Sequence, residues 1–228
     1  MRFKMKLGSR IRIVAVGVCI STALAGQLDM KVRNYFFAGF SGDAAALERG
    51  MKICEEALAA NPKDPEALVW HGSGEYFRAG EAFEKGDMQK GSALAQHGMK
   101  EMDDAVVIAP NNVSVRIPRG ATLLTASRFM PGEMGRPLIE KGLSDYERTL
   151  EVQAAFFAKL ETHSRGELLF GLAEGYSRMG NDPKARSYFE RIQAELKDTP
   201  YAKRAALWLE TKSLPASQTG CIGCHTGK

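Results

Sequence analysis

The last eight residues of the chain contain the side chains best suited to chemistry, Cys221, Cys224 and His225, in the order Cys-x-x-Cys-His. Covalent attachment of a haem needs two thiols that can react with the two vinyl groups of one porphyrin. It also needs an imidazole beside the second thiol that can bind the iron from one face. The sequence therefore predicts thioether bonds at Cys221 and Cys224, with His225 as the proximal iron ligand.

Other chemistries are open to the same residues. Cys221 and Cys224 could form a local disulfide bond or stay as unmodified thiols. A thioredoxin-like redox pair is disfavoured, because such a pair normally accompanies a βαβ pattern. A zinc site would need a fourth ligand, and the adjacent Cys224 and His225 suit tetrahedral coordination poorly.

The motif and its flanking glycines resemble the haem attachment sites of c-type cytochromes. That resemblance implies one covalent haem c as cofactor. In small cytochromes c the motif lies near the start and a helical domain follows it, whereas here only Thr226, Gly227 and Lys228 follow. The tail cannot build its own pocket, so a haem would have to lie against the rest of the chain, a partner or solvent.

Haem attachment of this type occurs outside the cytoplasm, and the first residues predict export. Residues 1–12 carry five basic side chains and no acidic one, Ile13 to Ile20 is apolar, and Ala23-Leu24-Ala25 offers the small residues that a signal peptidase cuts. The apolar run is far shorter than the roughly 20 residues of a membrane span. We therefore expect a signal peptide over residues 1–25 and a periplasmic or envelope-associated protein without a membrane span after cleavage; an uncleaved anchor is the alternative.

Charge and cysteine content exclude two further classes. Residues 1–25 hold five of the 31 basic residues and none of the 27 acidic ones, which leaves 26 basic and 27 acidic residues in the mature chain. No basic stretch with interleaved aromatic residues remains, so a nucleic-acid partner is not expected. Cys19 leaves with the signal peptide, and Cys54, Cys221 and Cys224 do not make a disulfide framework. Cys54 lies within an apolar helical stripe and is expected to be a buried hydrophobe.

The mature chain predicts an all-α fold. Helical patterns dominate from Asp29 to Lys212, and Val113 to Ile117 is the best strand candidate, but Pro118 follows it and no partner strand is evident. Helix starts are indicated by Asp64-Pro65, Ser164 and Asp182-Pro183.

Helix ends recur along the chain. Ala57 and Ala105 each stand five residues before a proline, Pro62 and Pro110, after which a new helical pattern begins. A later unit follows the spacing of a tetratricopeptide repeat (TPR) at Leu169, Leu172, Ala173, Tyr176, Gly180, Ala185 and Phe189. The region from Asp43 to Trp208 thus resembles the TPR family. The resemblance implies three to four antiparallel helix pairs, stacked into a right-handed superhelix whose concave face binds a protein partner.

The repeat is irregular in two places. Pro62 and Pro110 are 48 residues apart, against about 34 in a regular repeat. The surplus near Arg78 to Gln89 predicts lengthened helices or an insertion between them, and a Gly-, Pro- and Met-rich stretch covers Ser127 to Pro137. We expect the repeat domain to span residues 26–212, with a last helix from Pro200 to about Lys212, and a linker with the haem-binding tail to span residues 213–228.

A sixth iron ligand, if there is one, would come from the repeat domain. The last helix should run antiparallel to its predecessor, which places the linker near Met179; His163 should lie about 25 Å away, one helix length. Met179 and His163 are therefore the candidate distal ligands, although both residues and His71 also suit ordinary structural roles, and a five-coordinate haem is equally consistent with the sequence. No pair of histidines has metal-binding spacing.

Arg116, Arg119 and Arg128 are close in sequence and could line a concave surface for acidic peptide or haem propionates, or form a solvated face. No constellation of catalytic residues is present, so an enzyme is not predicted. The hypothesis that follows is an exported TPR-like scaffold with one c-type haem, acting in electron transfer or as a subunit of a periplasmic redox complex. The alternative is a cofactor-free envelope interaction module, loosely similar to the helical components of periplasmic solute-uptake systems.

Overall fold

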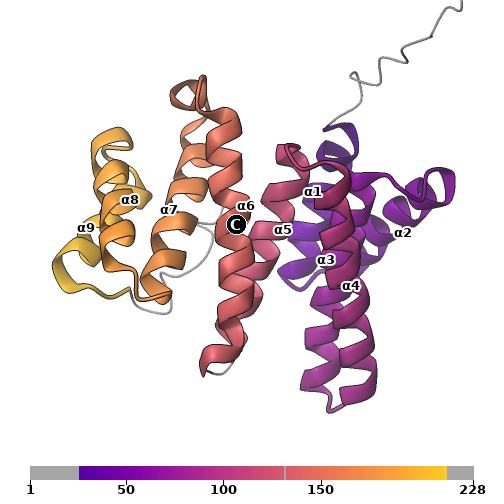
Figure 1. Ribbon diagram of the computed structural model, residues 1–228. Coiled ribbons are helices and arrows are strands. Elements are labelled where there is room, and N and C mark those ends of the chain that lie inside the picture. Colours follow the sequence, from indigo (N-terminus) through magenta and orange to yellow (C-terminus); the bar gives the residue numbers. More distant parts are fainter. Residues whose placement is uncertain (1–25, 131, 215–228) are drawn as a thin grey trace, which may run out of the picture.

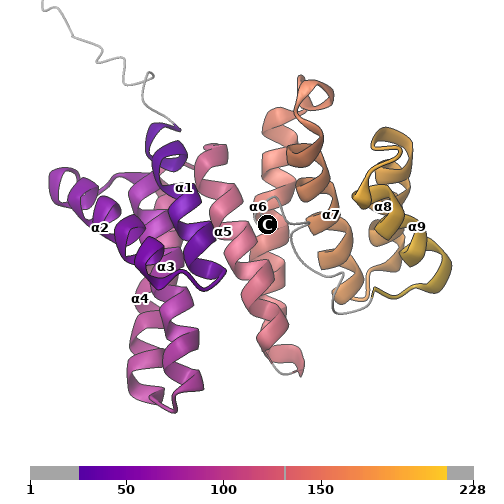
Figure 2. The same ribbon diagram turned by 180° about the vertical axis from the view of Figure 1, so that it is seen from behind.

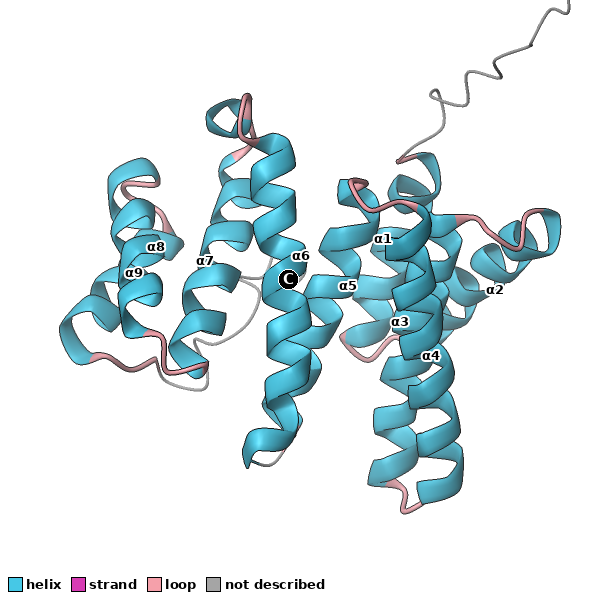
Figure 3. Cartoon of the chain, in the orientation of Figure 1, coloured by secondary structure: helices cyan, strands magenta, loops and turns pink. Residues whose placement is uncertain are grey.

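The computed structural model describes residues 26–130 and 132–214, and within them every regular element is a helix. The expected all-α class is confirmed, as the colouring by secondary structure makes plain (Figure 3). The helices are α1 (Gln27–Phe40), α2 (Ala44–Ala60), α3 (Pro65–Glu84), α4 (Met88–Ile108), α5 (Val113–Ala126), η1 (Ser127–Phe129), η2 (Gly132–Gly135), α6 (Arg136–Gln153), η3 (Phe157–Lys159), α7 (Thr162–Arg178), α8 (Asp182–Glu195) and α9 (Pro200–Thr211). No helix of the described ranges has both the length and the apolar character needed to cross a membrane.

Consecutive helices pair as antiparallel hairpins that stack side by side along the molecule (Figures 1 and 2). The hairpins are α1–α2, α3–α4, α5–α6 and α7–α8, and α9 covers the end of the stack. Each first helix also contacts the first helix of the next hairpin, from α1 to α3, α5, α7 and α9. The expected stack of helical hairpins is confirmed, and it contains four of them in the described part of the chain.

Side-chain caps start most helices at places the sequence marks. Asp64 accepts hydrogen bonds from the backbone N–H groups of Glu66 and Ala67, and Pro65 occupies the first helical position. At α8 the cap is Asn181, one residue before the predicted Asp182-Pro183 start. The prediction for Ser164 is wrong, because α7 begins at Thr162 and Ser164 lies inside it.

The candidate strand at Val113 to Ile117 is the first turn and a half of α5, and Pro118 lies within that helix. Asn112 caps the helix by accepting a hydrogen bond from the Ser114 N–H, and Val115 and Leu123 face the core with no exposed surface. No strand lies beside this segment in the described residues, so a helix is the conformation in which its backbone groups find partners.

The long step between repeats comes from lengthened helices rather than from an insertion. α3 has 20 residues and α4 has 21, and only the turn at Lys85 to Asp87 separates them. Gly86 takes a left-handed conformation there, with φ of 79°. In Figure 1 this pair extends below its neighbours. The second irregular stretch, Ser127 to Pro137, contains the short helices η1 and η2.

Two apolar cores fill the stack and meet on α5. The first is formed by α1 to α5 and includes Trp70, Met102 and Leu123; the second is formed by α5 to α9 and includes Leu124, Phe189 and Trp208. Leu123 and Leu124 are adjacent in the chain yet belong to different cores. The α5 helix therefore holds the two halves of the stack together.

The long hairpin depends on a close approach between two glycines. A Cβ atom on Gly98 would lie 2.5 Å from the Gly72 carbonyl oxygen, and one on Gly72 would lie 2.6 Å from the Gly98 carbonyl oxygen. Both neighbours are backbone atoms, which cannot swing away as a flexible side chain could. Only glycine at both positions allows α3 and α4 to lie this close.

We predict that Gly98→Ala lowers the free energy of unfolding by about 1–3 kcal/mol, because it overpacks this crossing. Gly80→Ala, also in α3, is the matched control: an added Cβ meets no atom within 4 Å there. That control should be neutral or stabilise the protein by about 0.5–1 kcal/mol through helix propensity. Urea denaturation followed by circular dichroism measures both changes, and equal effects of the two substitutions would contradict the packing argument.

Candidate functional site

The residues predicted to attach a haem, Cys221, Cys224 and His225, lie outside the described residues, as does the predicted signal peptide of residues 1–25. The structure does describe the body to which the tail connects, and the residues that could act together with it. These are Cys54, the two candidate distal ligands Met179 and His163, and the three arginines of α5 and η1.

Cys54 lies in the first core with no exposed surface, as the sequence predicts. Burial, together with the nearby carboxylates of Asp64, Glu101 and Glu55, raises the pKa of its thiol to about 12. A thiol with that pKa holds almost no thiolate near neutral pH, and the thiolate is the reactive form. Cys54 therefore does not compete with the tail cysteines for disulfide formation or for addition to a vinyl group.

We predict that Cys54 stays unmodified in the native protein. In the mature chain, residues 26–228, with Cys221→Ser and Cys224→Ser, Cys54 is the remaining thiol; at pH 8 a maleimide should react with it only as fast as the protein unfolds, because the thiol is both buried and protonated. The same variant in denaturant should react fully and quickly. Rapid labelling of the folded variant would show that Cys54 is accessible after all.

The last turn of α9 lies beside the last turn of α7, and Met179 is the residue directly after α7. The Trp208 indole N–H donates to the Ser177 hydroxyl oxygen over 2.8 Å, and Leu214 packs against the second core. Met179 is the C-cap residue of α7. The position of α9 is thus consistent with the prediction that the linker starts near Met179.

Met179 also lines a partly open pocket of about 240 Å³ between α6 and the α7–α8 turn. The lining residues are Arg136, Glu140, Leu143, Ser144, Glu147, Tyr176, Met179 and Asn181. Sites that enclose small molecules measure about 300–1,000 Å³, so this pocket cannot enclose a porphyrin. It can receive at most the edge of a flat ligand, with the thioether of Met179 and the guanidinium of Arg136 at its rim.

His163 lies at the opposite end of α7, in its first turn. Its Nδ1 atom is 2.9 Å from the Tyr201 hydroxyl oxygen, and that hydroxyl donates to Glu167 over 2.6 Å. The imidazole thus belongs to a polar group that fixes the start of α9 against α7. The described part of the chain separates His163 from Met179 by the length of α7, as predicted.

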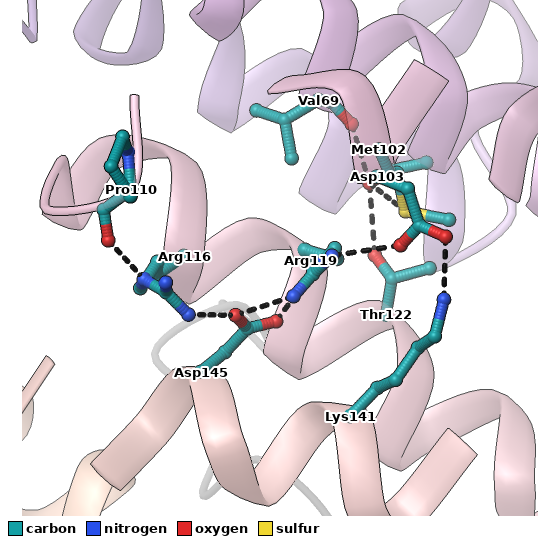
Figure 4. A network of polar contacts seen from close by, with 10 residues as sticks. Val69, Met102, Asp103, Pro110, Arg116, Arg119, Thr122, Lys141 and Asp145 are labelled. Carbon is teal, nitrogen blue, oxygen red and sulfur yellow. Dashed lines mark hydrogen bonds and ion pairs between the residues drawn. The ribbon is translucent and has the colours of Figure 1, made fainter. Parts of the chain in front are cut away.

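Neither interpretation of the three arginines, a ligand-lining surface or a solvated face, is correct, because each arginine is paired with a buried acid. Arg119 donates from Nε to Asp145 Oδ2 over 2.7 Å and from Nη2 to Asp145 Oδ1 over 2.8 Å; Arg116 donates to the same carboxylate over 2.7 Å (Figure 4). Arg128 pairs with Glu174 at 3.1 Å. None of them is available for an acidic peptide or a haem propionate.

The Asp145 cluster joins three helices, and its central residues are buried. Asp145 on α6 has no exposed surface, and Arg119 on α5 is only 7% exposed. Arg119 also donates to Asp103 on α4 over 2.8 Å, and Lys141 pairs with the same carboxylate (Figure 4). Burial raises the pKa of the Asp145 carboxyl, and the two guanidinium groups oppose that rise. These contacts are structural: they hold α4, α5 and α6 in register.

We predict that Arg119→Ala lowers the free energy of unfolding by about 3–5 kcal/mol, because it leaves the buried Asp145 carboxylate without its main partner. Arg186→Ala, which removes an exposed arginine paired with Glu190 on one face of α8, should change it by less than about 1 kcal/mol. Chemical denaturation of both variants provides the comparison. Similar losses would mean that the Asp145 cluster contributes no more than a surface ion pair.

The structure places two histidines that the sequence separates in one hairpin, each against a glutamate of the other helix. His71 on α3 and His97 on α4 lie in the long hairpin, where they contact Glu101 and Glu75 respectively. Burial lowers the pKa of His71, but the surrounding carboxylates of Glu101, Glu75 and Glu55 outweigh this and raise it above its usual value. No pair of histidines has metal-binding spacing along the chain, but in the described residues one histidine, His71, lies with Glu75 and Glu101 in a group that could hold a metal ion.

The fold and these contacts define the chain as an all-α stack of helical hairpins. No protein-family model matches the sequence. No curated protein matches it either. Among solved structures, the chain is similar to a thermophilic TPR protein of Thermus thermophilus, with 20% sequence identity and a TM-score of 0.40 over 82% of this chain and 100% of that one. The assignment of the fold rests on the helix order and contacts of this chain, since a TM-score of that size adds no weight.

Proposed function

We propose that this chain is an exported, periplasmic scaffold of helical hairpins that carries one covalent c-type haem on its C-terminal tail and binds a protein partner. It would act in electron transfer or as a subunit of a redox complex. The observation that carries the proposal is the order Cys221-x-x-Cys224-His225, with a signal-peptide pattern at the other end of the same chain.

Two features of the described residues support it. Cys54 is buried and unreactive, so the tail cysteines have only each other, or a cofactor, as reaction partners within the mature chain. The helices end at Thr211, before the motif, so modification of the tail need not disturb the hairpin stack.

The donor set of the tail fits a c-type haem, whereas the pocket beside Met179 is too small to enclose one. When bound, such a haem supplies one-electron transfer. His225 would hold the iron from one side, and Met179 is the better candidate than His163 for the other, because its thioether borders a pocket and lies near the start of the linker. A thioether ligand raises the reduction potential of such a centre relative to a second imidazole.

The row of first helices supports a role in partner binding. α1, α3, α5, α7 and α9 contact one another in succession, and rows of this kind form the extended binding surfaces of helical-repeat proteins. A cofactor near the surface of such a scaffold requires a docked partner for directed electron transfer. A redox protein or another envelope protein would fill that role.

The test is a haem-stained denaturing gel and an absorption spectrum of the protein, produced in a host with an active cytochrome c maturation system. We predict one covalent haem in the wild type and none in Cys221→Ala/Cys224→Ala, with the same helical circular dichroism in both. A colourless wild type from that host would favour the cofactor-free interaction module. Loss of the fold in the double variant would contradict the separation of tail and stack.

A further inference from the structure

The long hairpin carries the same short pattern on both of its helices. Residues 71–75 read His-Gly-Ser-Gly-Glu on α3, and residues 97–101 read His-Gly-Met-Lys-Glu on α4. In a helix, residues four apart lie on one face, so each helix presents a histidine and a glutamate together. The glycine after each histidine is one of the pair whose backbones touch.

The antiparallel crossing places each histidine against the glutamate of the other helix. His71 Nδ1 is 2.6 Å from Glu101 Oε2, and His97 Nδ1 contacts the Glu75 carboxylate. One ligand atom each from His71, Glu75 and Glu101 lies within 4.8 Å of the other two. His71 and Glu75 on α3 thus form one cluster with Glu101 on α4, beside the contact between Gly72 and Gly98.

The close packing of the helices does not explain the identity of these side chains. Gly72 and Gly98 suffice for the approach, and any polar residues could border it. Instead, the His71, Glu75 and Glu101 side chains are only 12%, 16% and 13% exposed, which makes two carboxylates costly unless their charge is compensated.

The basic side chains around these carboxylates do not fully neutralise their charge. Glu55 on α2 adds a third carboxylate, with its Oε1 atom 4.0 Å from His71 Nε2. In the described ranges, no lysine or arginine forms an ion pair with Glu55, Glu75 or Glu101; their charged partners are the imidazoles alone. Glu55 and His97 are 59% and 58% exposed, so water solvates them; the two mostly buried carboxylates of Glu75 and Glu101 share one mostly buried imidazole, His71, and a divalent cation would neutralise the remaining negative charge.

We propose that His71, Glu75 and Glu101 bind one divalent transition-metal ion of the zinc class between α3 and α4. An imidazole with two carboxylates favours Zn²⁺ and its first-row neighbours over Ca²⁺ or Mg²⁺, which prefer oxygen ligands throughout. Metal–ligand bonds of about 2.0–2.2 Å place ligand atoms roughly 3.3 Å apart in a tetrahedron. The three ligand atoms lie within 4.8 Å of one another, so they would have to approach by at most about 1.5 Å, which would leave a fourth position for water.

The neighbours of this cluster match the supporting residues of known metal sites. His97 donates from Nδ1 to the Glu75 carboxylate, and Glu55 approaches the second nitrogen of His71. Ligating histidines and carboxylates commonly have such partners, which fix their orientation and raise affinity. The site belongs to the first core and the predicted haem tail follows the second, so the two proposals are independent.

The experiment is isothermal titration calorimetry with ZnCl₂ on the full chain carrying Cys221→Ser and Cys224→Ser, so that tail thiolates bind no zinc. We expect one ion per chain. Glu75→Gln and Glu101→Gln, which keep the side-chain shape, should each weaken binding at least tenfold, and His97→Ala about 10–100-fold. Glu190→Gln on α8, whose carboxylate is exposed, is the matched control and should bind as the parent does.

Circular dichroism of each variant checks that the helices persist, and His97, being 58% exposed, can be replaced with little risk to folding. No binding by the parent would overturn the proposal. Equal affinity of the parent, Glu75→Gln and Glu101→Gln would also overturn it, since zinc would then bind elsewhere. A wild-type protein without covalent haem would not affect this titration, because the titrated variant lacks the tail thiols.

Discussion

The buried carboxylate of Asp145 is the constraint on which the arrangement of the stack depends. It has no exposed surface, and burial raises its pKa, a rise that the guanidinium groups of Arg119 and Arg116 on α5 oppose through direct hydrogen bonds. Replacing such a pair with apolar residues can be neutral, but an unpaired partner is costly. Shifting α5 along α6 would leave the Asp145 carboxylate without its arginine partners. The contact therefore selects one register of α5 against α6, at the place where the two cores meet.

The α3–α4 hairpin is governed by a different constraint. Backbone contact at Gly72 and Gly98 brings the two longest α-helices of the described chain closer than side chains would allow. The consequence is chemical as well as structural, because the same crossing gathers His71, Glu75, His97 and Glu101. A packing feature and a candidate ligand set thus have one origin, the repeated pattern of histidine, glycine and glutamate.

The two proposals use opposite parts of the molecule. The haem proposal concerns the tail after α9, where the body contributes Met179 and a pocket too small to enclose a porphyrin. The metal proposal concerns the long hairpin, where α3 and α4 contribute the ligands and α2 adds the neighbouring Glu55. A scaffold of stacked hairpins suits both, since each hairpin contacts mainly its neighbours and local sites can be added without changing the rest.

Much of the fold followed from local signals. Helix periodicity and the prolines after α2 and α4 predicted an all-α stack of hairpins, and Asp64-Pro65 marked the start of α3, because caps and proline act within a few residues. Signals that compete locally were less reliable. Val113 to Ile117 has strand-forming residues yet is helical, and Ser164 is a good cap that lies inside α7.

The sequence alone determined the helical class and the burial of Cys54, and it is the source of the haem prediction for the tail motif, since each depends on residue types and short spacings. Tertiary structure decided which partners the charged residues have. Three arginines that could have faced a ligand neutralise internal acids, and two histidines that look unrelated along the chain each contact a glutamate across one hairpin. Helix packing sets such contacts between residues far apart, and no local pattern records which faces will meet.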